Sequence, residues 1–199
     1  MRASTTLDVA VLVFSRRAVP GRVKTRLAPR LGDWGAARLH ARLTRHALRT
    51  AAAAGCGRVV LYDTAKQRGA DLGERMHRAL AQALRRHRGA IVIGCDCPAL
   101  RPADLARAAR SLAGGCEVVL APAEDGGYVL IGARRISPRL FSGIAWGSSE
   151  VYEATVRRLD ALGYRWRALR RLWDVDRPED LGRLRWLRYA STARPGVRR

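Results

Sequence analysis

The first half of the chain alternates short β-branched runs with longer segments of helical spacing. Strand-like runs at residues 9–14, 58–62 and 90–93 are separated by helical segments at 33–54 and 72–86, and a further helical segment follows at 98–112. Such short apolar runs are typical of strands that are buried on both faces of a parallel sheet. The repeated strand–helix order therefore predicts an α/β fold whose parallel strands are joined by crossover helices.

The second half of the chain changes this pattern. Strand-like runs at 117–121 and 128–132 are separated by only six residues, which is too few for a crossover helix, so we expect an antiparallel or bent pair. A helix at 148–162, an extended stretch at 167–172 and a last helix near Pro178 follow. We expect Asp33 to cap the helix at 33–54 and Asp176 to cap the last helix.

The length of 199 residues suits one α/β domain, which we place at residues 1–190. Residues 191–199 form a basic stretch with Pro and Gly, which we expect to be a disordered tail. The apolar run at 9–14 is short and follows Asp8 directly, as in a first strand rather than a signal peptide. No run approaches the ~20 apolar residues that cross a bilayer, so we expect a cytoplasmic protein without a membrane span.

The formal net charge of +21 comes almost entirely from arginine, since Lys24 and Lys66 are the only lysines. Such a field attracts anions. Because the arginines are spread along the chain and no nucleic-acid recognition module is present, we expect an anionic small molecule as the ligand and do not expect nucleic acid. A non-catalytic polyanion-binding protein remains the alternative that this charge supports.

The cysteines and histidines give no local motif. The cysteines lack the paired spacing of a zinc site and are too few for a disulfide scaffold, so we expect buried thiols in a reducing compartment. A soft-metal or redox site at Cys95 and Cys97 is the alternative, against which alternate residues of an extended segment point to opposite faces. The histidines fall in arginine-rich helical segments, where we expect surface or packing roles. These residues are Cys56, Cys95, Cys97 and Cys116, and His40, His46, His77 and His87.

The segment after the first strand, residues 15–27, combines one glycine, several cations and a hydroxyl. In α/β sheets this loop often binds phosphates through backbone N–H groups and a nearby cation. We expect Gly21 and Thr25 to shape such a site, Lys24 to supply a point charge, and Arg22 or Arg26 to supply a bidentate fork. An ordinary basic surface loop fits the same composition.

Asp96 lies just after the apolar run at 90–93, at the predicted carboxyl end of a strand. A carboxylate there offers hard oxygen ligands to Mg²⁺ or Mn²⁺ bridging to a diphosphate. Asp174 and Asp176 are two residues apart and could reach the same region. Capping of the last helix explains Asp176 equally well, so a turn or capping role competes with the metal role for these carboxylates.

A third group lies between the two strand-like runs of the second half. Glu124 and Asp125 precede Gly126 and Gly127, and Tyr128 begins the next strand. The glycines allow positive φ and a close approach of backbone to ligand, while Asp125 could bind a hydroxyl or act as a general base. The alternative is an ordinary hairpin loop, for which Asp-Gly-Gly is common.

Five ordered motifs extend over nearly the whole chain: PGRVKTRL at 20–27, LGERM at 72–76, GCDCPAL at 94–100, PAEDGGYVLIG at 122–132 and DVDRPEDL at 174–181. Together they resemble the bacterial family of GT-A-type glycosyltransferases that includes the arsenosugar-biosynthesis type. The resemblance implies a single-domain GT-A fold, a nucleotide-diphospho-sugar transferase-like three-layer α/β sandwich with a mixed, mostly parallel sheet. It also implies a nucleotide or nucleotide sugar and a small-molecule acceptor as ligands.

The resemblance implies roles for individual residues. By position, the first loop would hold the nucleotide phosphates and Asp96 would bind Mg²⁺ or Mn²⁺. In our leading hypothesis Asp176 also binds the metal, Asp125 and Lys24 are catalytic, and the 124–128 loop binds the acceptor. The phosphate-binding set is Gly21, Arg22, Lys24, Thr25, Arg26 and Arg75, and the acceptor-binding set is Glu124, Asp125, Gly126, Gly127 and Tyr128.

Two departures from the superfamily's patterns keep the reaction open. Cys95-Asp96-Cys97 stands where a glycosyltransferase often has a double-aspartate DxD motif, and the first loop lacks the GxGxRMG-like pattern of many nucleotidyltransferases. Glycosyl transfer from a nucleoside-diphosphate sugar is the leading prediction. Nucleotidyl transfer from a nucleoside triphosphate with release of pyrophosphate, of the guanylyl- or cytidylyltransferase type, is the alternative.

Overall fold

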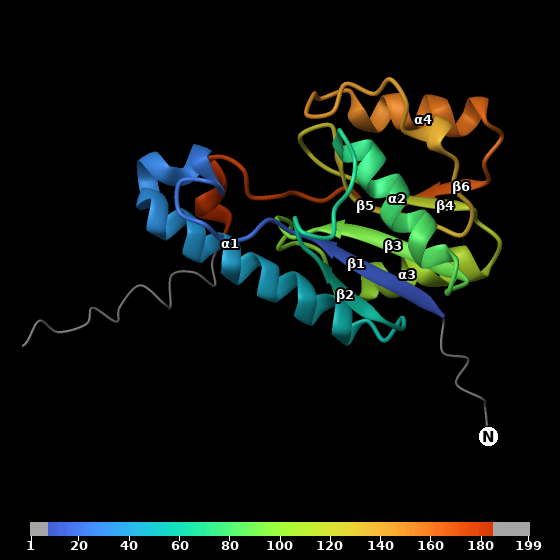
Figure 1. Cartoon of the computed structure of the whole chain (residues 1–199), viewed down its shortest axis with the longest axis horizontal. Helices are drawn as coiled ribbons and strands as arrows, with labels where there is room; N and C mark the ends of the chain where they lie inside the picture. The colour runs from blue at the N-terminus through green and yellow to red at the C-terminus, as the bar shows by residue number, and fades with distance from the viewer. Residues whose placement is uncertain (1–7, 185–199) are drawn as a thin grey trace, which may run out of the picture.

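A computed structural model describes residues 8–184, so the tail at 191–199 lies outside the described residues. Its centre is one six-stranded sheet (Figure 1). In spatial order the strands are β2 (Val59–Tyr62), β1 (Val9–Phe14), β3 (Gly89–Gly94), β5 (Tyr128–Ala133), β4 (Val118–Pro122) and β6 (Trp166–Ala168). Only β5 runs antiparallel to its neighbours in this sheet, which confirms the mixed, mostly parallel sheet and the antiparallel pair.

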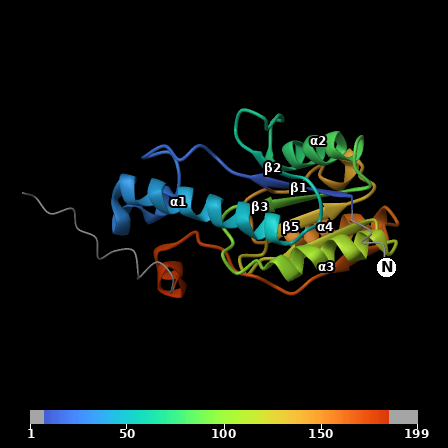
Figure 2. The same ribbon diagram turned by 90° about the horizontal axis from the view of Figure 1, so that it is seen from below.

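Helices cover both faces of the sheet. One face packs against α1 (Ala28–Ala53) and α3 (Pro102–Ala113), and the other against α2 (Leu72–Leu84) and α4 (Val151–Ala161). Figure 2 shows α2 on the side of the sheet opposite to α1 and α3. Side chains alternate between these layers, so that Val11 and Val13 of β1 face the first pair of helices, whereas Leu12 and Phe14 face the second. This three-layer arrangement is the predicted α/β sandwich.

A third, smaller core lies beyond the sheet. The 3-10 turn η1 (Thr25–Leu27) and the first half of α1 pack against residues 173–184, which include η3 (Pro178–Arg183). Figure 1 shows η3 beside the start of α1. The buried members of this core are Leu27, Leu39, Leu43, Val175 and Leu184. The 3-10 turn η2 (Pro138–Leu140) precedes α4. Between residues 8 and 184, no helix has the length and apolar character that a membrane span requires.

The predicted start of the first helix is wrong. The helix begins at Ala28 rather than near Asp33, with Leu27 at the N-cap position and Pro29 in the first turn, where its fixed φ suits the helix. Gly32 interrupts it with φ 67° and ψ 164°, and Asp33 follows this kink instead of capping the first turn. Pro29 and Gly32, which are common in loops, hid the first turn, which the third core stabilises.

The predicted cap of the last helix is also wrong. The helix is a 3-10 segment whose N-cap position is Arg177. Asp180 performs the capping, because its carboxylate accepts hydrogen bonds from the backbone N–H groups of Asp176, at 2.9 Å, and Arg177, at 2.7 Å. The carboxylate of Asp176 is therefore available for another partner.

Gly73 gives a test of how tightly α2 packs. A Cβ at this position would lie 2.3 Å from the Trp146 ring, so Gly73→Ala must displace the ring. We expect a loss of about 1–3 kcal/mol in the free energy of unfolding, although alanine is the better helix former by about 1 kcal/mol. Urea denaturation measures this loss, with Gly182→Ala, which meets nothing within 4 Å, as the control. An unchanged or raised stability of Gly73→Ala would contradict this packing.

Candidate functional site

Two hollows meet at the carboxyl ends of β1 and β3, the edge of an open α/β sheet where ligands commonly bind. The first, of about 500 Å³, contains the cations Arg16, Lys24, Arg26 and Arg75, and we call it the basic hollow. The second, of about 640 Å³, contains the carboxylates of residues 96, 124, 125, 174, 176 and 180 besides three arginines, and we call it the acidic hollow. Asp96 lines both hollows, as do Arg26 and Asp176.

Lys24 joins the first loop to the end of β3. Its Nζ lies 2.9 Å from Oδ2 of Asp96 and also donates a hydrogen bond to the carbonyl oxygen of Val175. The lysine side chain is 5% exposed and the aspartate 37% exposed, so the cation is buried beneath a carboxylate that still reaches solvent. Two of the three ammonium donors thus have protein partners, and one is available for a ligand.

The backbone of Lys24 has φ 49° and ψ 38°, in the left-handed region. It is the only non-glycine residue with positive φ among residues 8–184. Such a conformation persists when the surrounding contacts overdetermine it, and it is found preferentially at functional sites. The contacts of the Lys24 side chain with Asp96 and Val175 supply that constraint.

Arg26 and Asp176 form a second ion pair between the same two segments. Both side chains are exposed and both line the two hollows. The predicted metal-binding carboxylates, Asp96 and Asp176, are therefore brought to one region, but each already faces a cation of the first loop. A ligand that enters here must exchange these partners.

Asp174 adds a buried carboxylate to the acidic hollow. Burial first, and then the charges of Asp125 and Asp96, raise its pKa to about 6, while the charge of Lys24 opposes the shift. A group of carboxylates that repel one another is the donor chemistry that a hard divalent cation relieves. Asp96, Asp174 and Asp176 line this hollow with oxygen ligands of the kind that Mg²⁺ or Mn²⁺ prefers, although among the described residues these three carboxylates do not all lie within 4.8 Å of one another.

The 122–128 loop lines the acidic hollow. Oδ1 of Asp125 accepts a hydrogen bond from the backbone N–H of Gly127 at 2.9 Å, so this residue also forms the turn that the hairpin alternative predicts. Glu124 is paired with Arg183 through contacts of 2.7 and 3.0 Å. Gly126 has φ 90°, and a Cβ there would lie 1.9 Å from the carbonyl oxygen of Ser149, so only glycine fits.

Three of the remaining predicted site residues line one of the two hollows, and two line neither. Thr25 and Arg75 line the basic hollow, where Nε of Arg75 donates to the carbonyl oxygen of Gly69 at 3.1 Å. Tyr128 lines the acidic hollow, with its ring edge-on to Trp146. Gly21, with φ 71°, and the exposed Arg22 belong to the first loop but line neither hollow.

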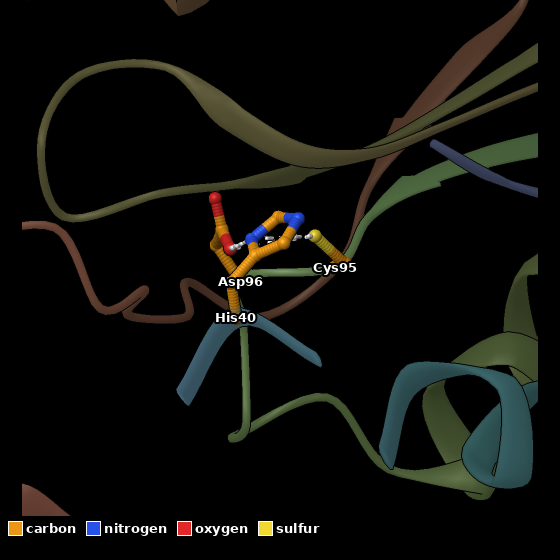
Figure 3. Close-up of side chains that lie close together, drawn as sticks. All are labelled: His40, Cys95 and Asp96. Atoms are coloured by element: carbon orange, nitrogen blue, oxygen red, sulfur yellow. Dashed lines mark hydrogen bonds and ion pairs between the residues drawn. The ribbon is translucent and has the colours of Figure 1, made fainter. Parts of the chain in front are cut away.

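His40, for which we expected a surface or packing role, is buried beside Asp96 (Figure 3). Its Nε2 lies 3.0 Å from the carbonyl oxygen of Arg16, and its Nδ1 lies 3.8 Å from Oδ1 of Asp96. The sequence signal was the position of His40 on the buried face of α1, beside Leu39 and Leu43. Cys95 is a buried free thiol, as expected, and burial raises its pKa to about 12.

The raised pKa of Asp174 makes stability depend on pH. Between pH 3.8, the ordinary pKa of the carboxyl group, and about pH 6, Asp174 keeps a proton in the folded protein and releases it in the unfolded chain. The contribution of Asp174 to the free energy of unfolding therefore falls as pH rises through this range. We expect Asp125→Asn to lower the pKa of Asp174, because it removes a neighbouring negative charge. Carboxyl ¹³C NMR titration measures both values, and a pKa near 4 in the unmodified protein would contradict the described burial.

Two solved structures have folds similar to that of this chain. The chain is 28% identical to a "putative nucleotide-diphospho-sugar transferase" from Desulfovibrio desulfuricans G20, with a TM-score of 0.79 over 96% of this chain and 91% of that one. It is 13% identical to CMP:2-keto-3-deoxy-manno-octonic acid synthetase complexed with CTP, with a TM-score of 0.54 over 92% of this chain and 99% of that one. The second likeness concerns the fold alone.

No curated protein sequence matches the chain. A family model described as "Uncharacterized protein conserved in bacteria (DUF2064)" matches residues 34–148, which is more than half of the chain. The match extends from the start of α1 beyond the kink to the segment that precedes α4. Together with the GT-A-type fold that the structural likeness shows, this match places the chain in the DUF2064 family of bacterial proteins.

Proposed function

We propose that this chain is a metal-assisted transferase that moves a glycosyl group from a nucleoside-diphosphate sugar to a small acceptor. The observation that carries the proposal is the meeting of a basic and an acidic hollow at Asp96. One hollow offers cations to a diphosphate, and the other offers carboxylates to hydroxyl groups. The similarity to a protein described as a nucleotide-diphospho-sugar transferase supports the same substrate class.

The donor phosphates would occupy the basic hollow. Arg26 and Arg75 can present planar guanidinium groups to phosphate oxygens, and Thr25 can donate its hydroxyl. Lys24 retains one ammonium donor beside Asp96. Lys24 and Arg75 are held by protein contacts before the ligand arrives, whereas Arg26 must exchange Asp176 for a phosphate. The negative charge that develops on the departing diphosphate would therefore meet donors that are in part preorganised.

A divalent cation would be held by Asp96, with Asp174 or Asp176 completing the oxygen ligands from the end of the chain. When bound, it would supply positive charge to the diphosphate oxygens. The acceptor would lie in the acidic hollow, where Asp125 would accept the proton or the hydrogen bond of its attacking hydroxyl. Trp146 and Trp173 line the same hollow and would exclude water from it.

Ligand-induced thermal stabilisation tests this proposal. We expect nucleoside-diphosphate sugars to raise the melting temperature when Mg²⁺ or Mn²⁺ is present, since a ligand at 100 times its dissociation constant adds ~2.7 kcal/mol of stability. Asp96→Asn should abolish the metal-dependent part of the shift and reduce turnover by about 10²–10³-fold. Glu117→Gln is the matched control, because this carboxylate is paired with Arg135 at the opposite end of β4.

The same screen distinguishes the two transfer reactions. Stabilisation by nucleoside triphosphates, together with pyrophosphate release in the presence of a phosphorylated acceptor, would establish nucleotidyl transfer instead. A metal-dependent shift that persists in Asp96→Asn would refute the role of this carboxylate in either reaction. Binding of polyanions that is unaffected by Asp96→Asn and falls steeply with salt would support the non-catalytic alternative.

A further inference from the structure

Three side chains of different donor chemistry converge on one point beside the basic hollow, where they are drawn in Figure 3. The distance from Cys95 Sγ to Asp96 Oδ1 is 3.4 Å, that from His40 Nδ1 to Asp96 Oδ1 is 3.8 Å, and that from Cys95 Sγ to His40 Nδ1 is 4.0 Å. Zinc bonds of about 2.0–2.3 Å in a tetrahedron separate neighbouring ligand atoms by about 3.3–3.7 Å. The three atoms are within a few tenths of an ångström of one face of such a tetrahedron.

The hydrogen bonds of His40 orient the ring for ligation. Nε2 lies 3.0 Å from the carbonyl oxygen of Arg16 and 3.2 Å from the hydroxyl oxygen of Ser15. Because the carbonyl oxygen can only accept, we assign the ring proton to Nε2. The opposite nitrogen, Nδ1, points toward Cys95 and Asp96. A ligating histidine characteristically donates its other ring N–H to a carbonyl or carboxylate in this way, which fixes the tautomer and the orientation of the ring.

The arrangement of Asp96 also leaves one oxygen for this group. Lys24 contacts Oδ2, whereas Oδ1 faces the histidine and the thiol. His40 and Cys95 are buried, but all three residues line the basic hollow, so an ion has a path from solvent and the hollow can supply a water as the fourth ligand. A set of one nitrogen, one sulfur and one oxygen selects zinc-like ions over Mg²⁺, which prefers oxygen ligands alone.

We propose that His40, Cys95 and Asp96 form a binding site for a borderline-soft transition-metal ion such as Zn²⁺, which shares Asp96 with the hard-cation site of the acidic hollow and takes its other protein ligands from His40 and Cys95. Binding replaces the thiol S–H bond with a sulfur–metal bond, and the proton leaves to solvent. The thiolate and the carboxylate together neutralise the two charges of the ion. The ammonium group of Lys24 keeps its contact with Oδ2 of Asp96.

The proposed transition-metal site and the hard-cation site both use Asp96, so occupation of one should affect the other. This consequence rests on the proposed function. An ion bound between His40 and Cys95 uses the carboxylate that the hard cation of the transfer reaction would need. Zn²⁺ would therefore compete with Mg²⁺ or Mn²⁺ and inhibit the transferase. Binding of Zn²⁺ itself requires neither nucleotide nor acceptor, so it is measured independently of the reaction.

Cobalt substitution tests the site in the full-length chain without nucleotide. We expect Co²⁺ to bind in a one-to-one ratio with a near-ultraviolet thiolate-to-cobalt charge-transfer band and visible bands of tetrahedral intensity, and Zn²⁺ to displace it. Cys95→Ser should remove the charge-transfer band and weaken Zn²⁺ binding, measured by competition with a chelator, by more than about 100-fold, beyond the loss typical of an outer-shell change. His40→Gln should weaken binding similarly.

Cys97→Ser and Cys116→Ser are matched controls, because neither thiol belongs to the convergent group, and both should retain the band and the affinity. X-ray absorption at the zinc edge of the unmodified protein should show one sulfur and two or three nitrogen or oxygen ligands. This measurement needs no substitution, so it tests the site even where Cys95→Ser fails to fold. Three results would overturn the proposal: metal binding that does not saturate, a zinc coordination shell without sulfur, or a charge-transfer band that persists in Cys95→Ser. The Mg²⁺- or Mn²⁺-dependent thermal shift with nucleotide sugars, measured without zinc, would be unaffected by such a failure.

Discussion

The buried ammonium group of Lys24 is the contact on which the site depends. It joins the loop after β1, the end of β3 and the 174–176 segment through Asp96 and the carbonyl oxygen of Val175. The backbone N–H of Val175 also donates to the carbonyl oxygen of Asp96 at 2.8 Å, so the two segments are held in register. Burying a cation is costly unless its partners are well placed, and here the partners come from segments far apart in sequence.

The fold could be predicted from the sequence because its strands are short β-branched runs whose period and flanking turns leave little choice. The two errors in the helices arose where local composition conflicts with tertiary packing. Leu27 anchors a helical turn that starts five residues before Asp33, in a core completed only by the end of the chain. Asp180 takes the capping role that the sequence pattern assigns to Asp176, whose carboxylate pairs with Arg26 instead.

The site was predictable as a list of residues but not as an arrangement. Lys24 and Asp96 each carried a signal, namely a cation in the first loop and a carboxylate at a strand end, yet nothing local indicates that they pair across the sheet edge. His40 had the periodicity of a core residue, and that periodicity is correct, but its partners come from the loop after β1 and from the end of β3. Burial follows from spacing within one helix, whereas the identity of a contact requires the fold.

The charges of the site constrain how any anionic donor could bind. The chain as a whole carries +21, but in the site Lys24 faces Asp96 and Arg26 faces Asp176, so these two cations are already neutralised. A diphosphate that arrived alone would draw the cations away and leave two carboxylates repelling each other beside Asp174. A divalent cation removes that penalty, because it takes the carboxylates as the phosphates take Lys24 and Arg26. Metal dependence would then follow from charge balance at the site, independently of which group is transferred.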